Sequence, residues 1–199
     1  MKLQGMKIAI LAIALSAGGS LSAGEVLPVQ NCTWCHGTSG QGFSTAPRLA
    51  GQRHQYLENQ LLDFSAHTRD NPLSKQYMWS AVAALDPQTR RDLAMYFSTI
   101  PPKPANDGDP ALAEAGRTIY ELGNPDANIV ACQVCHGPNG EGIRQIPRLA
   151  GLTYSYLTRK LGQWGEGFHA QAEPPMPRIA TKLSPHDIEA LASYLSFVR

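Results

Sequence analysis

The sequence has little charge, few cysteines and no excess of basic residues. Charged residues make up 17% of the 199 residues, with 17 Lys and Arg against 16 Asp and Glu. A chain without surplus positive charge cannot neutralise many phosphates, so we predict no nucleic-acid partner. Four cysteines are too few for a scaffold built on disulfides. Hydrophobic residues still reach 43%, so the chain has enough apolar material to fold.

The sequence also lacks an apolar run long enough for a typical membrane-spanning helix. Residues 8–23 are uncharged, but this stretch is shorter than the roughly 20 residues that a bilayer requires. Lys2 and Lys7 precede it and mostly small residues end it, which is the order of a secretory signal peptide. We predict a signal peptide at residues 1–23 and a periplasmic protein with peripheral or no membrane contact. A retained N-terminal anchor is the alternative.

The second half of the chain repeats the first. The segment CTWCHGTSGQGFSTAPRLAGQRHQYL at residues 32–57 returns as CQVCHGPNGEGIRQIPRLAGLTYSYL at residues 132–157. The numbering offset is 100 here and 98 further on, where Met78 corresponds to Met176. A match of this length at a nearly constant offset indicates a duplicated domain.

A proline-rich segment, PPKPANDGDP, separates the two copies and predicts an extended linker at residues 101–110. The first domain is then predicted at residues 24–100 and the second at residues 111–199. Each domain is small for a self-sufficient core, so we expect a bound cofactor or another staple in each.

The local signals are helical, and no stretch alternates as a strand does. Asp86 before Pro87 and Ser184 before Pro185 are typical of a helix N-cap followed by proline at the first helical position. Apolar residues at helical spacing follow both prolines. Further helices are predicted at residues 53–66, 111–122 and 154–164. We therefore predict an all-α fold of two tandem domains.

Each repeat begins with Cys-x-x-Cys-His, the signal for covalent attachment of a c-type haem. Two thiols three positions apart each form a thioether with one vinyl group of the same macrocycle, and the adjacent His supplies a nitrogen to the iron. We predict two covalently bound haem c groups, held by Cys32, Cys35 and His36 and by Cys132, Cys135 and His136.

Three other interpretations explain the cysteines less well. A disulfide within each pair leaves the repeated His unexplained. A zinc site needs four ligands close together, whereas the two pairs are distant in the sequence. A thioredoxin-like redox pair belongs to a βαβ context, which the helical pattern does not provide.

Methionine is the leading candidate for the sixth iron ligand, because a thioether favours reduced iron. Met78 and Met176 recur at matching positions in the two copies, whereas Met95 corresponds to Ser193 and is expected to fill a core. The remaining histidines are not repeated, so we expect them in loops or on the surface: His54, His67, His169 and His186.

Two further repeated pairs are candidate neighbours of the haem. Pro47 and Pro147 each follow their haem His by 11 residues, and their carbonyls are candidate acceptors for the second ring nitrogen of that His. A simple turn is the alternative. Arg48 and Arg148 are candidates to pair with haem propionates, and a solvated loop arginine is the alternative for each.

The chain resembles the periplasmic dihaem class I cytochromes of the cytochrome c-four family. The resemblance rests on the two C-x-x-C-H-G segments, the two P-R-L-A-G segments, the paired methionines and the terminal helix of each copy. It implies two His–Met haem domains related by an approximate two-fold axis, with propionate edges facing each other. It also implies electron transfer from a quinol-oxidising complex to a terminal oxidase or reductase.

One departure from that family lies in the first domain. Only GEVLPVQN, residues 24–31, stands between the predicted cleavage site and Cys32, which leaves no room for the helix predicted at residues 111–122 of the second domain. We expect apolar surface at Leu93 and Phe97 to be exposed or buried against a partner. We also predict that residues 24–103 are less stable on their own than residues 105–199.

We predict an electron carrier with no substrate chemistry of its own. An alternative is the cytochrome subunit of a dehydrogenase complex, such as a sulfide-oxidising flavocytochrome, since a shortened first domain would suit a permanent interface. A dihaem enzyme needs an open axial position on one iron, and two matched methionines argue against it.

Overall fold

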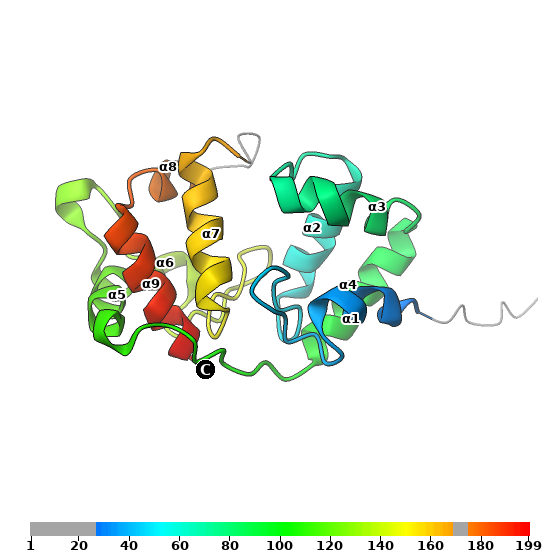
Figure 1. Ribbon diagram of the computed structural model, residues 1–199, viewed down its shortest axis with the longest axis horizontal. Coiled ribbons are helices and arrows are strands. Elements are labelled where there is room, and N and C mark those ends of the chain that lie inside the picture. Colours follow the sequence, from blue (N-terminus) through cyan, green and yellow to red (C-terminus); the bar gives the residue numbers. More distant parts are fainter. Residues whose placement is uncertain (1–26, 169–174) are drawn as a thin grey trace, which may run out of the picture.

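The computed structural model describes residues 27–168 and 175–199, which form two helical domains side by side (Figure 1). The predicted signal peptide, its cleavage site and His169 lie outside the described residues. Within the described ranges the chain has no strand and only two isolated bridge pairs, so the all-α prediction is confirmed. In this part of the chain, no helix combines the length and the apolar character needed to cross a membrane.

The two domains have parallel but unequal sets of elements. The first contains α1 (Val29–His36), α2 (His54–Ser65), a π-helical turn η1 (Ser74–Met78), α3 (Trp79–Val82) and α4 (Pro87–Thr99). The second contains α5 (Pro110–Leu122), a 3₁₀ turn η2 (Pro125–Ala127), α6 (Gln133–His136), α7 (Tyr154–Gly165), α8 (Met176–Ala180) and α9 (Pro185–Phe197). The motif helix ends at the His in both domains, but α1 contains the whole Cys-x-x-Cys-His motif whereas α6 starts just after Cys132.

Side-chain caps fix where the long helices begin. The Asp86 carboxylate accepts hydrogen bonds from the backbone N–H groups of Gln88 and Thr89, which would otherwise have no partner at the start of α4. Ser184 and Asp187 form a reciprocal capping box at the start of α9. The Asp109 side chain accepts a hydrogen bond from the Ala111 N–H, so α5 begins at Pro110, the last residue of the predicted linker.

The second domain is closed by α5, which packs across α9 (Figure 1). At their crossing, a Cβ atom added to Gly116 would lie 1.9 Å from the Ala190 carbonyl oxygen, so only glycine allows this approach. Ala190 and Ser193 of α9 are fully buried there. The core of this domain also includes Ile119, Tyr120, Leu152, Leu157, Leu191 and Leu195.

The first domain has no counterpart of α5 among its described residues, but Leu93 and Phe97 are not left open. They are 1% and 3% exposed, so the expectation that they form bare or partner-covered surface was wrong. They point into their own domain. Leu27, just before α1, and Val29, its first residue, pack against the same core. α1 begins earlier relative to its His than α6 does, and so brings this apolar material to the core.

The uncovered face of α4, which we define as Asp92, Met95 and Tyr96, is instead adapted to solvent. Asp92 stands where the second domain has Ala190, and Met95 stands where it has Ser193. All three side chains of the uncovered face are exposed, with Met95 at 50% and Tyr96 at 42%. An exposed carboxylate at the position of the α5–α9 crossing suits a face that no described helix covers.

The two domains are joined mainly by first-domain side chains that reach second-domain backbone. The guanidinium of Arg48 donates to the carbonyls of Lys103, Ala150 and Gly151. The Gln52 amide makes two hydrogen bonds with the backbone of Arg148, at 2.9 and 2.7 Å. In the opposite direction, Arg159 of α7 donates to carbonyls of the loop that precedes Pro47. This network fixes the mutual position of the domains.

Candidate haem sites

A single cavity of about 1060 Å³ extends through both domains and across their interface. Its walls contain every site residue predicted from the sequence: Cys32, Cys35, His36, Pro47, Arg48, Met78, Cys132, Cys135, His136, Pro147, Arg148 and Met176. Of the other described histidines, His54, His67 and His186 do not line this cavity. The fold therefore gathers residues about 100 positions apart in the sequence around one continuous space.

The two motif histidines have matching environments. His36 is 6% exposed and its Nδ1 donates to the Pro47 carbonyl at 2.7 Å, and His136 is 5% exposed with its Nδ1 2.9 Å from the Pro147 carbonyl. A carbonyl can only accept, so the proton is on Nδ1 and the lone pair of Nε2 is left for a metal ion. Burial lowers the pKa of both imidazoles, which favours the neutral form that binds iron.

Glycines shape the loop that brings each proline carbonyl to its histidine. The Gly42 N–H donates to the His36 carbonyl at 2.8 Å, and the Gly142 N–H donates to the His136 carbonyl at 2.7 Å. Both glycines have positive φ angles, of 81° and 66°. A Cβ atom at Gly42 would lie 2.4 Å from the Arg48 amide nitrogen, and one at Gly142 would lie 2.4 Å from the Ile146 carbonyl oxygen. The repeated glycines therefore permit the close backbone approach that the loop needs.

The four cysteines are all free thiols, and none is in a disulfide. In each motif the first cysteine is half-buried and the second is exposed. Burial raises the pKa of Cys32, and it raises the pKa of Cys132 to about 11. Each domain therefore presents one thiol at its surface and one inside, both bordering the cavity.

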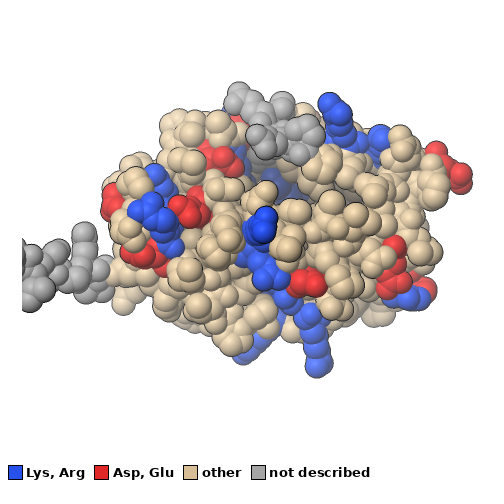
Figure 2. Space-filling model, turned by 180° about the vertical axis from the view of Figure 1, so that it is seen from behind, with Lys and Arg blue, Asp and Glu red and all other residues tan. Residues whose placement is uncertain are grey.

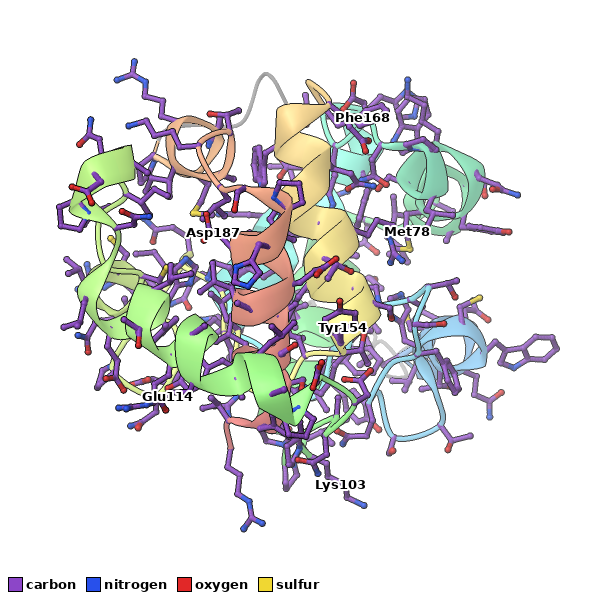
Figure 3. The ribbon with its side chains drawn as sticks, turned by 60° about the vertical axis from the view of Figure 1, so that its left-hand side comes forward. Met78, Lys103, Glu114, Tyr154, Phe168 and Asp187 are labelled. Atoms are coloured by element: carbon purple, nitrogen blue, oxygen red, sulfur yellow. The ribbon has the colours of Figure 1, made fainter. Side chains whose placement is uncertain are left out.

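The two paired methionines occupy different local structures. Met78 is the last residue of the π-helical turn before α3 (Figure 3), and Met176 is the first residue of α8. Both thioethers nevertheless belong to the wall of the same cavity as the two histidines. Met95 is 50% exposed on α4, so it is not the core residue that the sequence suggested.

The structure adds Arg69, which the sequence reasoning missed. This residue lies in the loop between α2 and η1 and lines the cavity, where it is only 9% exposed. Its guanidinium donates to the Gln60 side-chain carbonyl and to the Tyr156 hydroxyl. No repeated arginine corresponds to it, so a search guided by the repeat had no reason to select it.

Two buried N–H groups on this cavity wall have no hydrogen-bond partner among the residues that the structure describes: Nε of Arg69 and Nε of Arg148. An unpaired buried donor is costly, so such groups are expected to meet an acceptor from a bound molecule. Haem carries two carboxylates, which are suitable acceptors for guanidinium groups. The cavity walls therefore fit haem on three counts: free thiols, histidines with an available Nε2, and unsatisfied cationic donors.

The comparisons with known proteins agree with this geometry. Residues 21–101 and 113–198 match the family profile of cytochrome c. The chain belongs to the cytochrome c family. It is 34% identical over 187 residues to cytochrome c-552 of Acidithiobacillus ferridurans, which covers 92% of this chain and 80% of that protein. The two family matches, each with one Cys-x-x-Cys-His motif, correspond to two covalently bound haem c groups.

Solved structures and a further relative narrow the type of cytochrome. The cytochrome c4 structure of Acidithiobacillus ferrooxidans matches with a TM-score of 0.78 and 34% identity, covering 84% of this chain and 98% of that chain. A protein of Thiomonas intermedia, named thiosulfate dehydrogenase electron acceptor, is 31% identical over 173 residues, or 83% of this chain and 77% of that protein. This cytochrome is a dihaem electron carrier of the cytochrome c4 type.

Proposed function

We propose that this cytochrome carries electrons in the periplasm through two haems, each with one His and one Met on the iron. His36 and Met78 are the ligands of the first iron, and His136 and Met176 are those of the second. The observation that carries this assignment is the pair of Nδ1–carbonyl hydrogen bonds, because they leave Nε2 of both histidines available inside the shared cavity. When bound, haem supplies a one-electron Fe(II)/Fe(III) couple.

The protein residues hold and orient each haem. Cys32 and Cys35 attach the first haem and Cys132 and Cys135 attach the second. The Pro47 and Pro147 carbonyls keep each imidazole in one tautomer and orientation. Arg148 retains the proposed propionate contact through its unpartnered Nε. Both terminal nitrogens of Arg48 donate to backbone carbonyls, so we assign Arg48 to the domain interface rather than to a propionate.

A spectroelectrochemical titration of the holoprotein tests the ligand assignment. We expect two haems per chain, two one-electron steps and the weak charge-transfer absorption of Met-bound ferric haem. Met78→Ala and Met176→Ala should each remove about half of that absorption. Absence of the absorption in the unaltered protein, or its survival in the double variant, would contradict His–Met ligation.

The electron donor and acceptor are also proposed. We place the protein between a quinol-oxidising complex and a terminal oxidase or reductase. The alternative is a role as acceptor or cytochrome subunit of a dehydrogenase, such as a sulfide-oxidising flavocytochrome, and the name of the Thiomonas relative supports the acceptor version.

Reduction rates distinguish these two roles. The oxidised holoprotein is mixed separately with a quinol-oxidising complex and with the thiosulfate dehydrogenase of Thiomonas intermedia. Fast reduction by the complex alone supports the carrier role, and fast reduction by the dehydrogenase alone supports the acceptor role. Stable co-purification with a flavin-containing chain from the native host would instead indicate a permanent subunit.

A further inference from the structure

Arg69 gives the first haem site a buried cation whose direct contacts are with neutral groups, while the nearby Asp63 carboxylate favours its charge. Its guanidinium donates to the amide oxygen of Gln60 and to the phenol of Tyr156, 3.4 Å away in the second domain. The same group lies 4.7 Å from the centre of the Phe64 ring, where a cation–π contact stabilises it. These contacts fix the plane of the guanidinium, and Nε is left without a partner.

The backbone of Arg69 is tied to the segment that carries Met78. The indole N–H of Trp79, the residue after Met78, donates to the Arg69 carbonyl at 3.0 Å. Arg69 therefore links the methionine segment of the first domain with α7 of the second. A residue anchored at both ends in this way cannot swing into solvent, so its charge stays at the cavity wall.

No arginine corresponds to Arg69 in the second copy. The offset between the copies changes from 100 at Leu57 to 98 at Met78, so the counterpart of Arg69 falls among residues 167–169, which read Gly-Phe-His. Lys160 of α7 also lines the cavity and faces Arg69, Asp63 and Asp70. Burial and the Arg69 charge lower the pKa of Lys160 to about 5, which disfavours a second cation beside Arg69.

Most contacts of Arg69 belong to the first domain. Trp79, next to Met78, donates to its carbonyl, and its guanidinium lies against Gln60 and Phe64. A fixed positive charge near one iron disfavours the ferric state of that iron, because Fe(III) carries more positive charge than Fe(II).

We propose that Arg69 is a positioning residue for the first haem: its Nε–H donates to a carboxylate of that haem, and its buried charge raises the reduction potential of the first haem alone. The inference rests on the proposed electron-carrier function. It assigns an electrostatic difference between two haems that have the same predicted ligands.

The test compares Arg69→Gln, Arg69→Lys and Arg53→Gln in the holoprotein by spectroelectrochemical titration, with the first haem identified through Met78→Ala. Arg69→Gln should change the ratio of reduced to oxidised first haem at least tenfold at fixed applied potential, which is about 59 mV for one electron. Arg69→Lys should recover more than half of this shift, because it restores the charge. The second haem should keep its potential. Arg53→Gln is the matched control, since Arg53 donates across the domain interface to the Glu141 carbonyl at 2.7 Å and does not line the cavity.

Other outcomes overturn the inference. Unchanged potentials in Arg69→Gln with both haems bound would exclude the electrostatic role, and a shift equal to that of Arg53→Gln would assign it to the interface. Loss of the first haem alone from Arg69→Gln supports positioning, whereas loss of both haems contradicts it. If the Met charge-transfer absorption is absent and Met78→Ala shifts neither potential, the ligand assignment is refuted, while a shift of a single potential in Arg69→Gln still supports the role of Arg69.

Discussion

The two domains agree where they face the haem cavity and differ where they face outward. His36 and His136 have the same exposure, the same acceptor type and the same glycine-lined loop. Outside, α9 is covered by α5, whereas α4 presents Asp92 to solvent. Residues that hold a haem are restricted by the bonds and distances that haem binding requires. An outer helix face is restricted only by what covers it, so this face could diverge after the duplication.

The domains differ again at their interface. First-domain side chains, chiefly Arg48 and Gln52, donate to second-domain backbone, whereas Arg148 keeps an unpartnered Nε in the cavity. The approximate two-fold repeat of the sequence therefore does not produce a symmetric set of contacts. On the face shown in Figure 2, acidic and basic side chains are interspersed over a largely uncharged surface, in keeping with the low charge of the sequence.

The largest expected effect is on the haem potentials, when one of the two matched methionines is removed. Met78→Ala and Met176→Ala should each lower one haem potential by a few tenths of a volt, since axial ligands set haem potentials over a range of about 0.8 V. The other haem should change little in each variant. Titration of both holoproteins measures this, and a shift of both potentials by the same amount in either variant would contradict separate ligation.

The next largest effect is expected when the residues at one matched position on the outer faces of α4 and α9 are exchanged. Ala190→Asp should destabilise the second domain by about 3–5 kcal/mol, because it buries an unpaired charge beneath α5. The reciprocal Asp92→Ala should change stability by no more than about 0.5 kcal/mol, because Asp92 is exposed. Thermal and denaturant unfolding of the holoproteins measure both. A large loss from Asp92→Ala would reveal a packing role that the uncovered face of α4 does not show.

A smaller effect concerns the repeated arginines. Arg48→Ala should cost about 3 kcal/mol, because it removes charged donors from three backbone carbonyls at the interface. Arg148→Ala should cost about 1 kcal/mol or less, since its Nε makes no hydrogen bond within the chain. Denaturant unfolding compares the two variants. Equal losses of unfolding free energy would show that the two arginines stabilise the protein equally despite their different hydrogen bonds.

The smallest effect concerns exposed apolar residues beside the haem attachment sites. Trp34 is 86% exposed and Val134, its counterpart, is 71% exposed. Replacing either with Ala should change the free energy of unfolding by no more than about 0.5 kcal/mol, because neither side chain packs in a core. Unfolding curves check this. A marked loss in Trp34→Ala alone would show that the indole stabilises the first domain after all.

Amide hydrogen exchange of the whole holoprotein examines the predicted stability difference between the domains. We expect α4 to exchange faster than α9, because none of the described helices covers the outer face of α4. This measurement keeps the interface intact, so it complements melting of residues 24–103 and 105–199 as separate fragments. Equal protection of the two helices would indicate that the earlier start of α1 compensates fully for the absent helix.

Much of the fold followed from local signals in the sequence. The caps at Asp86 and Ser184 marked helix starts, because each supplies an oxygen to otherwise unpaired N–H groups whatever the rest of the protein does. The repeat located the domains, since only a shared structure preserves such a pattern. Exposure of Leu93 and Phe97 was misjudged, because it depends on which side of α4 faces the core and on where α1 starts.

The sequence by itself determined the two haem attachment motifs, their histidines, the paired methionines and the helical class, because these depend on residue type and short spacing. Only the tertiary structure decided that the two sites share one cavity, that Arg48 belongs to the interface, and that Arg69 is buried beside the first site. Those features depend on how a loop of one domain meets a helix of the other. Contacts between segments that are distant along the chain follow from packing, and no local pattern encodes them.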